Sequence, residues 1–251
     1  MLILLPPSEG KSVPHSGPPL DLDGLPFPEL RRTRRTLVTA LTTLCRTDPA
    51  AAASALGLGP RQADEVTRDA RLRRAPCAAA IEVYSGVVFD SLGYATMSRR
   101  QQHRADDRVV IASALWGLVR PTAMIPAYRL SGGTTLPGLG TMRRVWHDPL
   151  GTALSKLEGL VLDLRSGAYC ALAPMPRHES WVSVRVFHEH AGRRTIVSHH
   201  NKATKGLIAR AALTSAREPT GLAGLQSALT SWGYRVERER DASATLDVIV
   251  S

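Results

Sequence analysis

The sequence predicts a single compact domain of mixed α/β (α+β) class over residues 1–251, with a helical insertion near residues 30–80. Three observations support this prediction. Short apolar runs of buried-strand type recur along the chain, segments with helical periodicity separate several of them, and no internal repeat or low-complexity block interrupts the pattern. A hydrophobic content of 43% is enough to bury a full core.

The first element is expected to be a buried strand, because Met1 leads directly into the apolar run LILLP. No basic segment precedes this run, and Pro6 and Pro7 end it, so we expect neither a signal peptide nor a membrane span. The following residues 13–28 are rich in Pro, Gly and Asp, which predicts an irregular surface excursion.

Helices are predicted next. From Arg34 onward one helical face carries five apolar positions, and the pair Asp48-Pro49 supplies the cap and first-turn residues of a second, short helix. Those apolar positions are Leu37, Val38, Leu41, Leu44 and Cys45.

The stretch after the second helix matches the hairpin of a helix-hairpin-helix unit. Gly57 and Gly59 would permit a tight backbone turn, and the amides at the start of the next helix would face a DNA phosphate, with Arg61 beside them. A plain connection between two helices is the alternative interpretation of the same residues.

The later elements alternate between strands and helices. Strands are expected at 109–113, 160–164 and 182–186. A further strand is expected at 195–198, where it turns into a helix, and an edge pair of strands at 234–237 and 246–250 is expected to close the chain. Helices are expected to open at Asp148-Pro149 and at Pro219-Thr220, and to cover 203–215.

The net charge of +10 and the isoelectric point near 10.2 favour a polyanionic partner, because basic surfaces gain affinity for phosphate backbones through counterion release. Nearly all of this charge is arginine, so a bias toward arginine codons is the alternative. The three cysteines, Cys45, Cys77 and Cys170, are far apart and lack metal-ligand spacing, which predicts a reduced, cytoplasmic protein.

Candidate anion-binding residues gather in the motif HHNKATKG at 199–206, where a strand is expected to meet a helix. They are His199, Asn201, Lys202 and Lys205. The opening LLPPSEGKS is not a P-loop, because Leu5 stands where a P-loop has glycine. Lys11 nevertheless follows a buried strand, where ligands of open α/β sheets gather; a surface salt bridge is the alternative.

Two further segments place polar side chains after strands. Arg120, Tyr128 and Arg129 follow the strand at 109–113, and guanidinium groups bind phosphate or carboxylate with two bonds. Alternatively, Arg120 or Arg129 pairs with Asp163 or Glu82.

The run VLDLRSGAYC carries Arg165, Ser166 and Tyr169, a candidate nucleophile system that lacks the G-x-S-x-G elbow. Next along the chain, His188-Glu189-His190 precedes an expected hairpin tip at Ala191-Gly192, and neighbouring strand residues face opposite ways. No metal site and no cofactor are therefore expected.

The motifs LLPPSEGK, EVYSGVVFDSLG, ALWGLVRP, IPAYRL, DLRSGAY and HHNKATKG, with Trp146 before a helix, resemble the YaaA peroxide-stress protein family in its PPSEGK-type branch. The resemblance implies a compact "cantaloupe" fold, a helix-hairpin-helix-like element beside a positively charged cleft, DNA binding, and protection against hydrogen peroxide. The cleft residues that it implies are Lys11, Tyr84, Ser85, Arg120, Tyr128, Arg129, Arg165, Ser166, Tyr169, Lys202 and Lys205. The chain departs from the family pattern at Ser131–Gly133 and at His200.

Two hypotheses follow. The first is a cytoplasmic DNA-binding protein that contacts duplex phosphates through Gly57, Gly59 and Arg61 and through the basic cleft, without strong sequence specificity. A low aromatic content of 5% argues against a reader that stacks single-stranded bases. The alternative is an enzyme acting on a nucleotide, a nucleoside or another small anion, with a catalytic set of Lys11, Tyr84, Ser166 and Tyr169.

Overall fold

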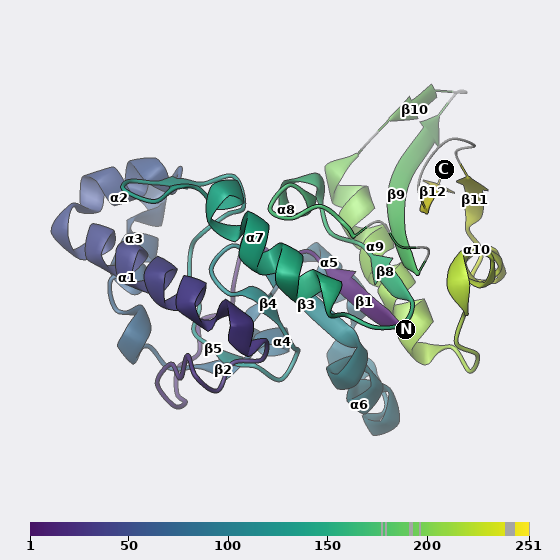
Figure 1. Ribbon diagram of the computed structural model, residues 1–251, viewed down its shortest axis with the longest axis horizontal. Coiled ribbons are helices and arrows are strands. Elements are labelled where there is room, and N and C mark those ends of the chain that lie inside the picture. Colours follow the sequence, from purple (N-terminus) through teal and green to yellow (C-terminus); the bar gives the residue numbers. More distant parts are fainter. Residues whose placement is uncertain (177, 179, 191–192, 196, 239–243, 251) are drawn as a thin grey trace.

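The computed structural model describes residues 1–176, 178, 180–190, 193–195, 197–238 and 244–250 (Figure 1). Within these residues a mixed sheet runs in the order β11-β12-β9-β8-β1-β3-β4, with β10 pairing on β9. The predicted mixed α/β class is confirmed. The strands are β1 (Leu2–Leu5), β3 (Val109–Ser113), β4 (Gly117–Val119), β8 (Val161–Asp163), β9 (Trp181–His190), β10 (Arg193–Thr195), β11 (Arg235–Arg238) and β12 (Thr245–Val250).

The middle of the sheet is parallel. β1 pairs in parallel with β3 on one side, where Ile3 lies opposite Val109, and with β8 on the other, where Ile3 lies opposite Leu162. Because both faces of β1 are covered, its run LILL is apolar without alternation, as expected of a central parallel strand. The carboxyl ends of β8, β1 and β3 therefore meet at one edge of the sheet.

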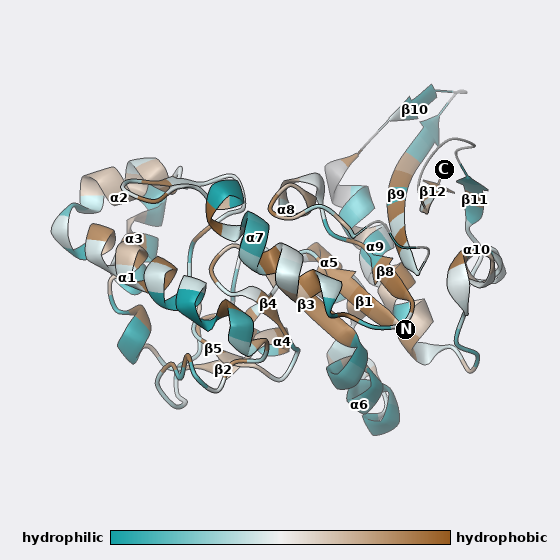
Figure 2. Ribbon diagram, viewed as in Figure 1, coloured by the Kyte–Doolittle hydropathy of each residue, from teal (hydrophilic) through white to brown (hydrophobic). Residues whose placement is uncertain are grey.

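The predicted edge pair is also present: β11 and β12 are antiparallel, and β12 runs parallel to β9. β9 and β10 form the predicted antiparallel hairpin, whose expected tip at Ala191-Gly192 lies outside the described residues. Figure 2 shows the apolar colour concentrated on β1 and β3, whereas β10 and α6 are hydrophilic.

Three helices occupy the predicted insertion and form a lobe at one end of the molecule (Figure 1). The predicted face of the first helix is buried at Leu37, Val38, Leu41 and Cys45, so amphipathic periodicity holds it against the rest of the lobe. The elements of this lobe are η1 (Pro28–Leu30), α1 (Arg31–Thr47), α2 (Pro49–Ala55), η2 (Pro60–Gln62), α3 (Ala63–Asp69) and η3 (Leu72–Arg74).

The remaining elements surround the sheet. The helices are α4 (Ala80–Val83), α5 (Val87–Leu92), η4 (Tyr94–Thr96), α6 (Arg99–Arg108), α7 (Met142–Ser155), α8 (Gly167–Cys170), α9 (Ser198–Thr214) and α10 (Gly221–Ser231). Two small antiparallel sheets are also present. One pairs β2 (Ala78–Ala79) with β5 (Met124–Ile125), and the other pairs β6 (Thr135–Leu136) with β7 (Gly140–Thr141). In the described part of the chain, no helix is long and apolar enough to cross a membrane.

Several predicted boundaries are wrong. The helix expected to open at Asp148-Pro149 already begins at Met142, where Thr141 caps it by accepting the Arg144 amide, and Pro149 lies inside it. The buried face of α7 extends on both sides of Pro149, and this burial outweighs the hydrogen bond that a proline removes. The strand expected at 195–198 is also displaced, since β10 ends at Thr195 and α9 begins at Ser198 instead of Ala203.

The earlier start of α9 places the motif HHNKATKG within a helix. Packing explains the glycine at the end of this motif, because a Cβ on Gly206 would lie 2.3 Å from the Val88 carbonyl oxygen of α5. The α5 and α9 backbones can approach this closely only without a side chain at that position.

Candidate functional site

The carboxyl end of β1 carries the first group of candidate residues. The chain leaves β1 through Pro6 and Pro7 and places Lys11 in an isolated antiparallel bridge with Tyr84, while the Ser12 amide donates to the Val83 carbonyl at 2.8 Å. The Ser85 amide donates to Ser8 Oγ at 3.1 Å. The segments that carry the motifs PPSEGK and YSG are therefore joined by a backbone bridge and by a hydrogen bond to the Ser8 side chain. We call Lys11, Asp69, Tyr84, Tyr128 and Arg129 the strand-end cluster.

The Lys11 amine lies against aromatic rings. Its Nζ is 4.1 Å from the centre of the Tyr128 ring and 5.6 Å from that of Tyr84, and it donates to the carbonyl oxygens of Ser8 at 3.0 Å and Glu9 at 3.4 Å. Among the described residues, no carboxylate forms an ion pair with this amine. Desolvation therefore lowers the pKa of Lys11 to about 8, although the Glu9 charge opposes the shift.

A chain of hydroxyl groups extends from this pair of rings into the core. Tyr84 Oη lies 2.9 Å from Tyr128 Oη, which lies 2.7 Å from Ser113 Oγ at the end of β3. The amides of Leu115 and Trp116 both donate to Ser113 Oγ, at 3.2 and 2.9 Å. Because these amides occupy both lone pairs, Ser113 donates to Tyr128, Tyr128 donates to Tyr84, and the Tyr84 proton remains for another acceptor.

Burial keeps both phenols protonated at neutral pH. Desolvation raises the pKa of Tyr84 to about 12 and the pKa of Tyr128 well above its ordinary value. The two rings thus act as hydroxyl groups and as apolar walls around Lys11.

Asp69, at the end of α3, is a site residue that the sequence did not indicate. It is fully buried; its Oδ1 accepts the Arg129 amide at 3.0 Å, and its Oδ2 has no hydrogen-bond partner among the described residues. Burial raises its pKa to about 8, against the opposing effect of the Arg129 amide, so the carboxyl is largely protonated at neutral pH. A proton on Oδ2 is then available as a hydrogen-bond donor.

Glu9 contacts the Arg129 side of the cluster, and Tyr169 and Ser166 follow β8 nearby. Arg129 Nη1 donates to the Glu9 carbonyl oxygen at 3.3 Å and lies 3.6 Å from Glu9 Oε2. Burial, reinforced by the Glu9 charge, raises the pKa of Tyr169. Ser166 is the half-buried N-cap of α8, and its carbonyl accepts the Tyr169 amide at 2.9 Å.

Arg165 has a structural environment. Its guanidinium pairs with Asp163 at 2.7 Å, with both side chains 1% exposed, and it donates to the Ala173 carbonyl at 3.1 Å. Lys205 Nζ donates to the Arg165 carbonyl at 2.8 Å, which ties α9 to the loop after β8, and desolvation lowers the pKa of Lys205. The Arg165 guanidinium therefore uses its donors within the protein and is not available to a ligand. Lys205 is half-buried and lies at the carboxyl end of β8.

Other candidate residues lie apart from the cluster. Arg120 is at the opposite end of β3, where it donates to the Asp107 carbonyl at 2.8 Å and packs against Phe27. The alternative pairings of Arg120 or Arg129 with Asp163 or Glu82 are not present in the described part of the chain, because Asp163 pairs with Arg165 and Arg129 with Glu9.

The α9 motif is only partly brought to the site. Lys202 is exposed, Asn201 Oδ1 is buried without a partner among the described residues, and the His199 side chain lies outside them. The His200 ring lies 4.7 Å from the ring of His188, and desolvation lowers the pKa of His188. Within the described residues no group of three metal-ligating side chains is present.

A second feature is a groove of about 890 Å³ on the helical lobe, beside α1, α3 and η3. We call it the arginine groove. Arg68 pairs with Glu65, and Arg73 donates to Thr39 Oγ1 at 2.8 Å. The other guanidinium groups are exposed and have no partner among the described residues. The arginines that line the groove are Arg46, Arg68, Arg71, Arg73 and Arg74.

The predicted hairpin lies between α2 and η2. Gly57 has a φ of +64°, which favours glycine, whereas Gly59 is extended, with a φ of −82°, and the position of its missing Cβ is open space. The amides of Gly57 and Gly59 already donate within the turn, to Ser54 O at 3.1 Å and to Gln62 Oε1 at 3.3 Å. The exposed Arg61 side chain is therefore the more accessible phosphate contact at this turn.

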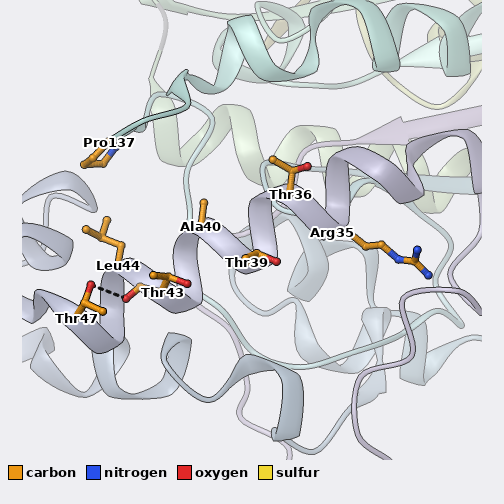
Figure 3. A pocket seen from close by; sticks show the side chains of 8 residues that line it. All are labelled: Arg35, Thr36, Thr39, Ala40, Thr43, Leu44, Thr47 and Pro137. Atoms are coloured by element: carbon orange, nitrogen blue, oxygen red, sulfur yellow. Dashed lines mark hydrogen bonds between the residues drawn. The ribbon is translucent and has the colours of Figure 1, made fainter.

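A second hollow of about 720 Å³ follows the outer face of α1 beneath Pro137 (Figure 3). Its polar groups are mainly threonine hydroxyls, and the Thr47 hydroxyl donates to the Thr43 carbonyl at 3.0 Å. Arg35 is the charged residue among those that line this hollow, and it pairs with Asp23 at 2.7 Å. This hollow has no acid, base or nucleophile comparable to the strand-end cluster.

Sequence reasoning also missed Glu9 and Ser113. Glu9 lies inside the motif PPSEGK, so its position was available as a signal, but its contact with Arg129 joins residues far apart in the chain. Ser113 ends a buried strand, and its role depends on the turn that points the Leu115 and Trp116 amides at its hydroxyl.

Comparisons with known proteins agree with the resemblance seen in the motifs. The family model described as peroxide stress protein YaaA matches residues 1–240. A UPF0246 protein of Streptomyces coelicolor is 42% identical over 259 residues, covering 100% of this chain and 98% of that protein. One of Corynebacterium efficiens is 40% identical and covers 100% of both, and one of Bordetella pertussis is 30% identical over 59% of this chain and 61% of that protein.

Proposed function

The chain belongs to the YaaA peroxide stress protein family, and from that premise we propose that it is a cytoplasmic protein that binds duplex DNA through phosphate contacts during hydrogen peroxide stress. The observation that carries this proposal is the arginine groove. Its exposed guanidinium groups, Arg46, Arg71 and Arg74, have no partner among the described residues, and they lie on the same lobe as the hairpin with Arg61.

The physical basis of binding is electrostatic. Each arginine that neutralises a phosphate releases condensed counterions, which favours association at low salt regardless of base sequence. Phosphate contacts position a protein on DNA but carry no sequence information, so weak sequence specificity is expected. The net charge of +10 adds a long-range attraction to the same polyanion.

A titration of labelled duplex DNA at several salt concentrations tests this proposal. The double substitution Arg71→Ala and Arg74→Ala removes two phosphate contacts, and the slope of log affinity against log salt becomes shallower by roughly two units, at about 0.9 for each contact. The matched control is Arg99→Ala with Arg100→Ala on α6, which removes the same charge from two exposed arginines outside the groove. Equal losses in both variants would reduce the effect to net charge and reject the groove as the binding surface.

A second function is favoured by the strand-end cluster. Lys11 and Asp69 have pKa values moved toward neutrality, and they lie beside a directed chain of hydroxyl groups. Such shifts cluster at catalytic sites, because proton transfer needs groups that gain and lose protons near the working pH. We propose that the cluster acts on a small substrate such as a nucleotide, a nucleoside or another small anion.

In this second function Lys11 is the reactive amine or base, and Tyr84 donates a proton. Tyr169 borders the substrate, and Ser166 is a candidate nucleophile at the start of α8. A turnover screen with nucleotides and nucleosides tests this second function. Lys11→Met and Tyr84→Phe are each expected to abolish turnover. Duplex binding stays unchanged in both variants, because the arginine groove is a separate surface. Turnover that survives both substitutions would remove the cluster from catalysis.

A further inference from the structure

We propose that Lys11 is a nucleophile that forms an imine with the carbonyl group of a small aldehyde or ketone. This inference deepens the second proposed function by naming the substrate class of the strand-end cluster. It does not depend on DNA binding, and it can fail while the cluster retains another chemistry.

The surroundings of the amine favour a nucleophile. The ammonium is held by two main-chain carbonyl oxygens and by the face of the Tyr128 ring, and it has no carboxylate ion pair among the described residues. Loss of its proton therefore breaks no salt bridge. The Lys11 residue is half-buried, so part of it remains exposed to solvent.

A lysine in apolar surroundings has a lowered pKa and more free amine at neutral pH, and this is a known route to Schiff-base lysines. The charged groups around Lys11 act in both directions, and burial decides the direction of the shift. Glu9, Asp69 and Glu65 favour its charged form, whereas burial and Arg129 disfavour it, and burial is the largest effect.

Imine formation also needs an acid, and the cluster supplies two. Asp69 Oδ2 is buried without a partner among the described residues, and Asp69 and Lys11 act on each other electrostatically. Tyr84 is the last donor of the chain that begins at Ser113, so its proton is also free to be donated.

The reaction balances without an oxidant or a reductant. The Lys11 lone pair forms an N–C bond, the carbonyl π pair moves to oxygen, and a proton passes from nitrogen to that oxygen. Asp69 then donates its proton to the hydroxyl group, the C–O bond breaks, and water leaves as the nitrogen lone pair forms the C=N bond. The product is an iminium ion beside the Asp69 carboxylate and the Tyr128 ring, and both stabilise a cation.

The competing explanation is that Lys11 only fastens the loop after β1 by donating to Ser8 and Glu9. A structural lysine of this kind would not react faster than an exposed one. The chain makes the comparison simple, because Lys11, Lys156, Lys202 and Lys205 are its only lysines.

The test incubates the full chain with glyoxylate and cyanoborohydride at neutral pH, which reduces each imine to a stable secondary amine. Peptide mass spectrometry then measures the extent of labelling at each lysine over time. Lys11 is labelled at least about tenfold faster than the exposed Lys202 and Lys156, because a pKa lowered by more than one unit raises the free amine more than tenfold. Labelling of Lys11 that is no faster than that of Lys202 in the folded protein overturns the proposal.

Two variants separate chemistry from structure. Asp69→Asn keeps an oxygen for the Arg129 amide but cannot donate a carboxyl proton, and Tyr84→Phe keeps the ring that stacks on Phe89. Both slow labelling at Lys11 severalfold and leave the rate at Lys202 unchanged, whereas a purely structural lysine would show no such selectivity. Turnover of a nucleotide without any Lys11 labelling would reject the imine and retain the second proposed function.

Discussion

The strand-end cluster and the arginine groove use charge in opposite ways. In the cluster, desolvation moves the pKa values of Lys11 and Asp69 toward neutrality. In the groove, Arg46, Arg71 and Arg74 remain exposed, so their charges attract an anion without changing protonation state. Under the two proposed functions, the strand-end cluster would serve proton transfer and the arginine groove of the same chain would serve phosphate contact.

The two regions meet on a single helix. Arg68 of α3 lines the groove, while the neighbouring Asp69 points into the core and accepts the Arg129 amide. The lobe is therefore not a free appendage, because its third helix supplies a buried carboxyl group to the strand-end cluster.

The largest expected difference between the regions concerns stability. Asp163→Asn removes the partner of the buried Arg165 guanidinium and leaves a charge in the core, which costs about 3–5 kcal/mol of unfolding free energy. Arg71→Ala in the groove changes it by no more than about 0.5 kcal/mol, because the side chain is exposed and has no partner among the described residues. Urea unfolding of the two variants measures both values, and similar costs would contradict the contrast.

The second prediction concerns pH. The folded pKa of Asp69 is raised to about 8, so its stabilising contribution is complete below the unfolded pKa of about 4 and is lost as pH rises toward 8. The folded pKa of Lys11 is lowered to about 8, so its contribution is present above the unfolded pKa of about 10.5 and is lost as pH falls toward 8. The two effects together predict a stability minimum near pH 8.

Unfolding measured from pH 4 to pH 10 tests this minimum. Between pH 4 and pH 8, the unfolding free energy of Asp69→Asn rises by more than about 2 kcal/mol relative to that of the wild type. Lys11→Met changes the dependence of the unfolding free energy on pH only above pH 8. Parallel profiles for wild type and Asp69→Asn would mean that the carboxyl titrates normally and is not held in its neutral form.

The sequence predicted the elements whose signals are local. The LILL run, the apolar face of α1 and the β11–β12 pair were each visible as local apolar patterns, and the strand-end position of Lys11 followed from the first of them. The start of α7 was missed because its buried face depends on tertiary packing across Pro149. Asp69 was missed for the same reason, since it occupies a polar stretch, ADEVTRD, that becomes buried only when α3 docks.

The smallest predicted effect concerns the hairpin between α2 and α3. Gly59 is extended and its missing Cβ faces open space, so Gly59→Val leaves the fold intact, whereas Gly57→Val places a side chain at a φ of +64° and strains the turn. Gly59→Val is thus the cleaner test of whether a phosphate approaches this backbone.

If it does, Gly59→Val weakens duplex binding by steric exclusion, and Arg61→Ala makes the slope of log affinity against log salt shallower by about one unit, as expected for one lost phosphate contact. Both losses are equal across duplex sequences, because a phosphate carries no base identity. A loss that depends on sequence would indicate base readout. Unchanged affinity in both variants, with circular dichroism unaltered, would reduce the hairpin to a connection between helices and leave phosphate contact to the arginine groove.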